Sequence, residues 1–291
     1  MAEIPVTVGV DGSDASLAAV RWGAAEAARR GVPLRLLHAH RSRGDSRQFF
    51  VGTSAEEERV VERMRAACQE ATQRHPELAA AAEETPQAAV EALLEAAGTS
   101  ALLVLGSRGA GRLSGFLTGS VALPVVAHAT GPVVVVRDGT DDVSQVPPDS
   151  PVVVGLDVEH RIDPVAGFAF DEAESMHRPL VAVHVWTLQH LYAYPSALPD
   201  PRVGAGLEAR AHRALESGLG PWCAEHPDVK TRRLVLDGRV APRLLQAAEE
   251  ACLVVVGRRL HKRRSPAAPL GSVTHAVLHH AAAPVAVVPH Y

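Results

Sequence analysis

The chain has 291 residues, 47% of them hydrophobic, and its 29 basic and 33 acidic side chains give a formal net charge of −4. This hydrophobic content is typical of globular proteins, and the length suggests two domains. The near balance of charge argues against the basic face of a nucleic-acid-binding protein, so we expect no nucleic acid partner.

Targeting and redox signals are weak. No apolar run approaches the roughly 18 to 20 residues of a membrane span, and the N-terminal stretch lacks the layout of a signal peptide. The three cysteines, Cys68, Cys223 and Cys252, are too few and too scattered for a disulfide framework. We therefore expect a cytoplasmic protein with buried thiols and no membrane partner.

Strand-like and helix-like patterns alternate along the first half of the chain. The predicted strands cover residues 4–10, 34–40, 79–84, 101–105 and 132–136. After the first strand, Asp11-Gly12-Ser13-Asp14 offers helix N-caps, and Gly31 would end the helix. The inward face of that helix is expected to hold Leu17, Val20, Ala24 and Ala28. Glu26 falls outside that face.

Three further helices fill the gaps between these strands. The second begins at Ser54 with the spacing of a capping box. The third is expected to start at Thr85-Pro86 and to close at Gly98, and the fourth covers residues 120–128. This alternation predicts a parallel, doubly wound α/β sheet with helices on both faces.

The same pattern restarts after a polar segment. VVVGLD at 152–157 parallels VTVGVD at 6–11 at an offset of 146, and GSV at 271–273 parallels GSV at 119–121 at an offset of 152. The chain is therefore interpreted as a tandem repeat. We expect domain 1 at 1–138, a linker at 139–150 and domain 2 at 151–291.

A glycine-rich stretch follows the fourth strand, at 102–120. Arg112 and Leu113 stand where a P-loop needs Lys and Ser or Thr, so the stretch is not a P-loop. Glycines after a strand and before a helix nevertheless let backbone N–H groups approach a phosphate. Its recurrence at the sheet edge where open α/β folds bind ligands favours a nucleotide or phosphate site in the first copy.

Together these residues resemble the universal stress protein family in its tandem two-domain form. The most specific signal is the spacing of Gly106, Gly109 and Gly119-Ser120, joined by VGVDGSD near the start and PVVVV at 132–136. The resemblance implies two open sheets of five strands in order 3-2-1-4-5, similar to adenine nucleotide alpha-hydrolases. It further implies ATP, alone or with magnesium, at the carboxyl ends of the strands, and a role in the stress response.

The resemblance also implies a set of site residues in the first copy. Asp11 would contact adenine or ribose, the backbone near Ala39 would contact the adenine edge, and Gly106 and Gly109 would admit ribose and phosphates. The terminal phosphates would bind at Gly119, Ser120 and Val121. None of these groups is an evident general base, so we expect binding rather than catalysis.

The second copy departs from this pattern. Leu260 replaces the second glycine, and its side chain would narrow any space for phosphate. Val158-Glu159-His160 replaces Gly12-Ser13-Asp14. The equivalents that remain as candidate nucleotide ligands are Asp157, Gly257, Gly271 and Ser272.

Two alternatives to a nucleotide sensor stay open: an enzyme that cleaves ATP to AMP and pyrophosphate, and a nucleotide-free interaction scaffold.

His38 and His184 occupy equivalent strand positions, which suits a shared structural role. The other histidines lack partners at metal spacing, so no metal site is expected. Residues 186–201 are expected to form a covering loop. The resemblance implies that strands 133–136 and 285–288 pair within the chain as a pseudo-dimer, and a homodimer is a further option.

Overall fold

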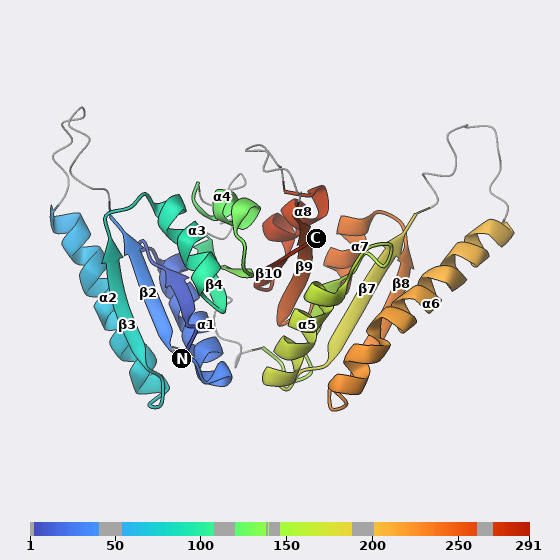
Figure 1. Ribbon diagram of the computed structural model, residues 1–291, viewed down its shortest axis with the longest axis horizontal. Helices are drawn as coiled ribbons and strands as arrows, with labels where there is room; N and C mark the ends of the chain where they lie inside the picture. The colour runs from blue at the N-terminus through green and yellow to red at the C-terminus, as the bar shows by residue number, and fades with distance from the viewer. Residues whose placement is uncertain are drawn as a thin grey trace. The chain divides into compact units, whose positions relative to one another are not determined.

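The computed structural model describes residues 3–40, 54–107, 120–137, 139, 146–187, 201–260 and 270–291. The chain divides into two compact units, Met1–Gln145 and Val146–Tyr291, and each is described by itself. Each unit alternates strands and helices (Figure 1).

The first unit contains five strands and four helices among its described residues. In chain order they are β1 Val6–Gly9, α1 Asp14–Arg30, β2 Leu34–Ala39, α2 Ser54–Arg74, β3 Ala80–Thr85, α3 Ala89–Thr99, β4 Leu102–Ser107, α4 Ala122–His128 and β5 Val133–Arg137.

The described part of the second unit repeats this series. Its elements are β6 Val152–Gly155, α5 Asp163–Ser175, β7 Leu180–Trp186, α6 Pro201–Glu225, β8 Thr231–Asp237, α7 Val240–Ala247, β9 Leu253–Arg259, α8 Ser272–His280 and β10 Val285–His290.

The strand order in the first unit is β3-β2-β1-β4-β5, and in the second unit β8-β7-β6-β9-β10. Neighbouring strands within each unit run parallel. Both units therefore confirm the predicted order 3-2-1-4-5, in which the first strand lies between the second and the fourth.

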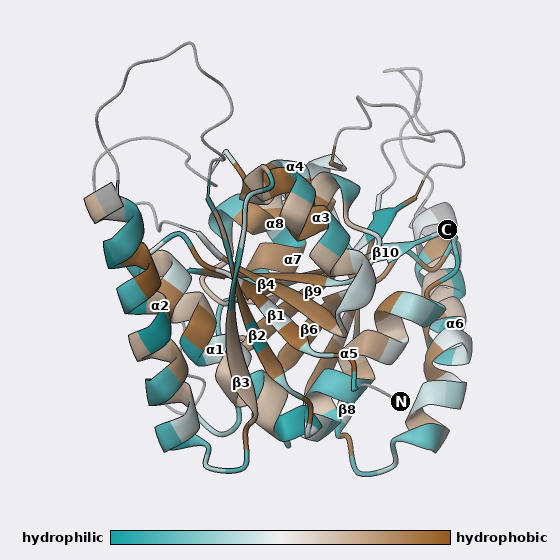
Figure 2. Ribbon diagram, turned by 60° about the vertical axis from the view of Figure 1, so that its left-hand side comes forward, coloured by the Kyte–Doolittle hydropathy of each residue, from teal (hydrophilic) through white to brown (hydrophobic). Residues whose placement is uncertain are grey.

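Each core lies between its sheet and the covering helices, where the strands are mostly apolar (Figure 2). Leu102, Leu103 and Val104 of β4 are fully buried, because a parallel strand covered on both faces has no solvent-facing side. Trp22 of α1 and Met64 of α2 are also buried.

The prediction that Glu26 lies outside the inward face of the first helix is wrong. Its side chain is fully buried on α1, which packs against β1, β4 and β5 and therefore buries more than one face. Arg29 binds one carboxylate oxygen at 2.5 Å and Arg30 binds the other. Burial raises the pKa of Glu26, but the two positive charges outweigh it and hold this pKa below its usual value.

Two predicted helix starts are also wrong. Thr85 ends β3 instead of capping α3, because its carbonyl accepts a hydrogen bond from the N–H of His40 at 2.9 Å. The helix begins at Ala89, and it continues past Gly98 to Thr99. The fourth helix begins at Ala122, two residues after the predicted Ser120.

Other boundaries agree with the sequence patterns. Ser13 caps α1, its hydroxyl accepting the N–H of Ser16 at 3.2 Å. Gly31 ends that helix in the left-handed region at φ 65°, where glycine carries no Cβ penalty. The second helix starts at Ser54 as expected. No helix in the described ranges is long and apolar enough to cross a membrane.

Candidate functional site

The candidate site of the first unit lies at the carboxyl edge of its sheet, around the loop that joins β1 to α1. β1 pairs with β2 on one side and with β4 on the other. In this strand order the connections diverge beside β1, and open α/β sheets bind ligands in the resulting crevice. The structure describes the β1–α1 loop, whereas Gly109 and Gly119 lie outside the described residues.

Asp11 is the acidic group of this loop, and its side chain is held in place. One carboxylate oxygen, Oδ1, accepts hydrogen bonds from the Ser13 N–H at 3.0 Å and the Ser13 hydroxyl at 2.5 Å. Burial raises the pKa of Asp11, but these hydrogen bonds outweigh it and hold the pKa below its ordinary value of 3.8. Asp11 is therefore an exposed, ionised and ordered acceptor at neutral pH.

Helix α2 contacts the other side of the same loop through Arg63. Arg63 donates one hydrogen bond to the carbonyl of Gly12 and another, at 2.6 Å, to Oδ1 of Asp14. Gly12 has a φ of +77°, and a Cβ there would lie 2.8 Å from Val60 of α2. The loop therefore requires glycine both for its backbone conformation and for its contact with α2.

A buried histidine supports the loop from β2. Nδ1 of His38 lies 2.7 Å from the carbonyl of Val10, and in the second unit Nδ1 of His184 lies 3.0 Å from the carbonyl of Leu156. Both imidazoles are buried. The equivalent contacts confirm the predicted shared structural role of these two histidines.

Ala39 lies next to Asp11 across the sheet. Gly9 pairs with Leu37, and the Val10 N–H donates to the Leu37 carbonyl at 2.9 Å, so continuing the register places Ala39 level with Asp11. Ala39 is half-buried at the last position of β2. The fold thus brings together two residues that the resemblance assigns to the nucleoside.

Gly106 lies at the same edge, in β4, where its missing side chain makes room for α1. A Cβ on Gly106 would lie 2.6 Å from the backbone N of Ser16 and closer still to the carbonyl group of Ala15. The glycine therefore lets the first turn of α1 pack directly on β4. This contact is intramolecular and differs from the expected approach to ribose.

Ser120 and Val121 occupy a turn before α4, with Ser120 exposed and Val121 half-buried. Val121 is the N-cap residue and makes no side-chain cap hydrogen bond. Ser120 therefore lies before the helix rather than at its first position, which the sequence pattern indicated.

The equivalent edge of the second unit is arranged differently. Asp157 accepts a hydrogen bond from Nδ1 of His160 at 2.8 Å and from the Glu159 N–H at 3.3 Å. Arg259, from the end of β9, lies 3.7 Å from the same carboxylate. The carboxylate that corresponds to Asp11 thus has two cationic or potentially cationic partners within its own unit.

Side chains also crowd the second copy of the β4 glycine. A Cβ on Gly257 would lie 2.7 Å from Nε2 of His290. Burial lowers the pKa of His290 below 6.5, and the charges of Arg259 and His160 act in the same direction. Leu260 is the residue directly after β9, and its N–H donates to the His290 carbonyl at 2.6 Å.

The start of α8 keeps the predicted layout. Gly271 is the N-cap residue and Ser272 is the first helical residue, both exposed. The helix α5 begins at Asp163, three positions after His160, the residue that aligns with Asp14 at the offset of 146. The β6–α5 loop is therefore longer than the β1–α1 loop, and it gives His160 room to reach Asp157.

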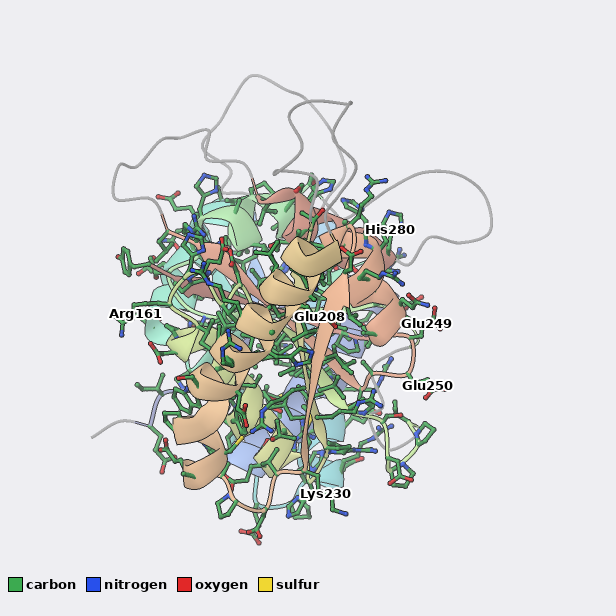
Figure 3. All side chains as sticks on the ribbon, turned by 90° about the vertical axis from the view of Figure 1, so that its right-hand side faces the viewer. Arg161, Glu208, Lys230, Glu249, Glu250 and His280 are labelled. Carbon is green, nitrogen blue, oxygen red and sulfur yellow. The ribbon has the colours of Figure 1, made fainter. Side chains whose placement is uncertain are left out.

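A cleft of about 710 Å³ lies elsewhere in the second unit. It borders the first residues of β7 and β8, the edge opposite Asp157, and its rim carries Lys230, Glu249 and Glu250 (Figure 3). Its position separates it from the candidate nucleotide edge.

Sequence patterns did not point to Arg63, Arg259 or His290. Arg63 contacts residues 49 and 51 positions away in the sequence, so no local motif could reveal it. Cys68 and Cys223 are half-buried, Cys252 is buried, and none of the three forms a disulfide. In the described residues no group of three or more histidine, cysteine or acidic side chains is placed to hold a metal. Residues 188–200 of the predicted covering loop lie outside the described ranges.

Comparison with known proteins identifies the family. The model of the universal stress protein family matches residues 5–137 and 150–289. Universal stress protein Rv1996 of Mycobacterium tuberculosis is 34% identical over 301 residues, covering 97% of this chain and 94% of that protein. Universal stress protein Rv2623 of the same species is 32% identical and covers 87% of this chain and 86% of that protein.

A solved structure shows the same fold. The crystal structure of a universal stress protein from Archaeoglobus fulgidus matches with a TM-score of 0.68 at 19% identity, covering 98% of each chain. The chain therefore belongs to the universal stress protein family, and it carries two tandem copies of the family's domain.

Proposed function

We propose that the first unit binds ATP, alone or as its magnesium complex, and that the protein acts in the stress response as a nucleotide-dependent regulator. The observation that carries this proposal is the Asp11 carboxylate, which Ser13 holds ionised at the switch point of the sheet. An ordered anionic acceptor next to backbone groups suits the hydroxyl groups of a ribose.

The neighbouring groups supply the other parts of the site. Ala39 lies level with Asp11 and offers backbone groups to the adenine edge. Ser120 and the turn before α4 offer polar groups to the phosphates. Gly109 and Gly119 join this set on the family resemblance.

The chemistry of Asp11 supports binding without turnover. A general base works best when its pKa lies near the operating pH. The hydrogen bonds from Ser13 hold the pKa of Asp11 below 3.8, so this carboxylate is a weak base for activating water. The proposed role is therefore recognition of the nucleotide.

We propose one nucleotide per chain, bound in the first unit. In the second unit Asp157 is engaged by His160 and Arg259, and the side chain of His290 lies over Gly257. A nucleotide there would have to displace these contacts and accommodate Leu260. Asp157, Gly257, Gly271 and Ser272 are accordingly the weaker set of candidates.

A stoichiometry measurement tests both the binding of ATP in the first unit and the single site per chain. Purified protein is stripped of ligand by denaturation, the released ultraviolet-absorbing material is identified, and the refolded chain is titrated with ATP by calorimetry. We expect one site per chain, weakened at least about tenfold by Asp11→Ala, because a lost charge-assisted hydrogen bond is worth about 1.5–3 kcal/mol.

The matched control is Asp157→Ala, which removes the equivalent carboxylate from the second unit and should leave ATP affinity unchanged. Two equal sites per chain would contradict the assignment to the first unit. Unchanged affinity in Asp11→Ala would remove the basis of the site. Release of pyrophosphate or phosphate at a steady rate would favour the ATP-cleaving alternative, and an absence of both ligand and binding would favour the scaffold.

A further inference from the structure

Two histidines of α8 lie together on one face of that helix. The imidazole rings of His275 and His279 have centroids 4.3 Å apart and are tilted by 48°. The two residues are four positions apart, and this spacing places side chains one above the other on a helix. The sequence alone predicts no metal site at these histidines, because no cysteine or carboxylate lies at metal spacing from them.

Neither histidine belongs to the buried face of the helix. Thr274, Val277 and Leu278 are the buried residues of α8, while His275 is exposed and His279 is half-buried. His280 is adjacent in sequence, but it lies about 140° around the helix from His275 at five residues' separation. Its ring centroid is 6.5 Å from that of His279 (Figure 3 labels His280 at the end of α8).

The first unit shows that the fold itself does not require this pair. At the repeat offset of 152, His275 and His279 correspond to Leu123 and Ala127 of α4, whereas His280 corresponds to His128. Nδ1 of His128 lies 2.8 Å from the carbonyl of Pro124, a contact within its own helix. The paired imidazoles are therefore a property of the second unit.

We propose that His275 and His279 form a two-histidine site for a divalent transition-metal ion that favours nitrogen ligands, with Cu²⁺ bound most tightly. Two imidazoles at i and i+4 on one helix face are a known arrangement for holding a metal ion. Imidazole suits copper, nickel and zinc, and affinity among these divalent ions is greatest for copper.

The position of the pair within α8 also favours a cation. The helix covers Ser272–His280, so His279 lies in its last turn and His275 one turn before it. The C-terminal end of a helix carries partial negative charge from its free carbonyl groups, and this charge favours a bound cation. Water or an added ligand would fill the remaining coordination positions, because no third described side chain joins the pair.

The test is a Cu²⁺ titration of the full chain without nucleotide, so its outcome does not depend on the proposed ATP site. Calorimetry measures affinity and stoichiometry, and electron paramagnetic resonance reports the number of coordinated imidazole nitrogens. The parent is compared with His275→Ala, His279→Ala and the double variant. His280→Ala is the matched control, because it removes an imidazole from the same helix but leaves the pair intact.

We expect each single substitution to weaken one Cu²⁺ site by about tenfold or more, since changing even an outer-shell partner of a metal ligand typically costs 10–100-fold. The resonance spectrum should change from two imidazole nitrogens to one. His280→Ala should leave both readings unchanged. Alanine favours helix, so the circular dichroism and thermal midpoint of each variant should match the parent.

Two results would overturn the proposal. One is a parent chain with no Cu²⁺ site that the double variant removes. The other is a loss of affinity in His280→Ala as large as that in His275→Ala, which would show that the chain's 15 histidines bind copper without regard to position.

Discussion

The contact between Gly106 and the start of α1 makes Gly106→Ala a sharp perturbation of the first unit. The added methyl group would lie 2.6 Å from the backbone N of Ser16 and closer to the carbonyl of Ala15. These are backbone atoms of a capped helix, so they cannot move aside as a flexible side chain would. Either α1 or β4 must shift.

We expect Gly106→Ala to lower the free energy of unfolding of the first unit by about 2 kcal/mol, the net of two opposing effects. Overpacking in a well-packed core costs about 1–3 kcal/mol, and the backbone nature of this contact favours the upper part of that range. Replacing glycine also stiffens the unfolded chain, which offsets about 0.4–1 kcal/mol. For a unit of this size the remaining loss lowers the thermal midpoint by roughly 4–8 °C.

The assay needs a signal from the first unit alone. The chain has three tryptophans, of which Trp22 lies in the first unit and is fully buried on α1. In a Trp186→Phe, Trp222→Phe background, urea unfolding followed by fluorescence therefore reports on that unit. Gly98→Ala in α3 is the control within the same unit, because its added Cβ would meet only the side-chain hydroxyl of Thr130, at 3.3 Å.

We expect Gly106→Ala to lower the urea midpoint of the Trp22 signal much more than Gly98→Ala does. ATP affinity should also fall, because α1 carries Ser13, which orders Asp11. A Gly106→Ala chain as stable as its parent would refute the packing argument. Normal stability with weakened ATP binding would instead assign Gly106 to ligand approach.

Three further predictions concern caps and charges. Ser13→Ala removes the cap bond to the Ser16 N–H and should cost about 1 kcal/mol in the same urea assay, while a stable variant with intact ATP binding would contradict the role of Ser13. Replacing both arginine partners of Glu26 by Met leaves a buried carboxylate unpaired, so stability should fall by about 3 kcal/mol or more, and an unchanged urea midpoint would contradict the pairing. The pKa of His290 is lowered below 6.5, so the unfolded state binds more protons in that range and stability falls as the pH drops below 6.5. His290→Gln should therefore reduce the loss of stability between about pH 7 and about pH 5, measured by urea unfolding at each pH. An equal loss of stability in the parent and in the variant would contradict this.

Much of the fold follows from local patterns in the sequence. The β-branched run before Asp11 and the run at 132–136 predict buried strands, because strands covered on both faces are continuously apolar. Gly31 ends α1 as expected. The tandem repeat then carries these assignments into the second unit.

The errors arise where a distant segment decides the outcome. Glu26 is expected outside the inward face of α1, yet packing of this helix on β1, β4 and β5 buries it, with Arg29 and Arg30 as its partners. Thr85 has the properties of a helix cap, but pairing with β2 keeps it in a strand. The spacing of Asp157 matches that of Asp11, and only the folded chain shows that Arg259 reaches it from another strand.

The contacts of the two buried histidines fix the tautomer of each imidazole. A carbonyl oxygen can only accept a hydrogen bond, so the contacts of His38 with Val10 and of His184 with Leu156 require a proton on Nδ1. With Nδ1 committed as a donor, only Nε2 of each ring is left to contact any further group. Each imidazole therefore ties its strand, β2 or β7, to the residue just before Asp11 or Asp157, and this anchors the loop that carries the carboxylate.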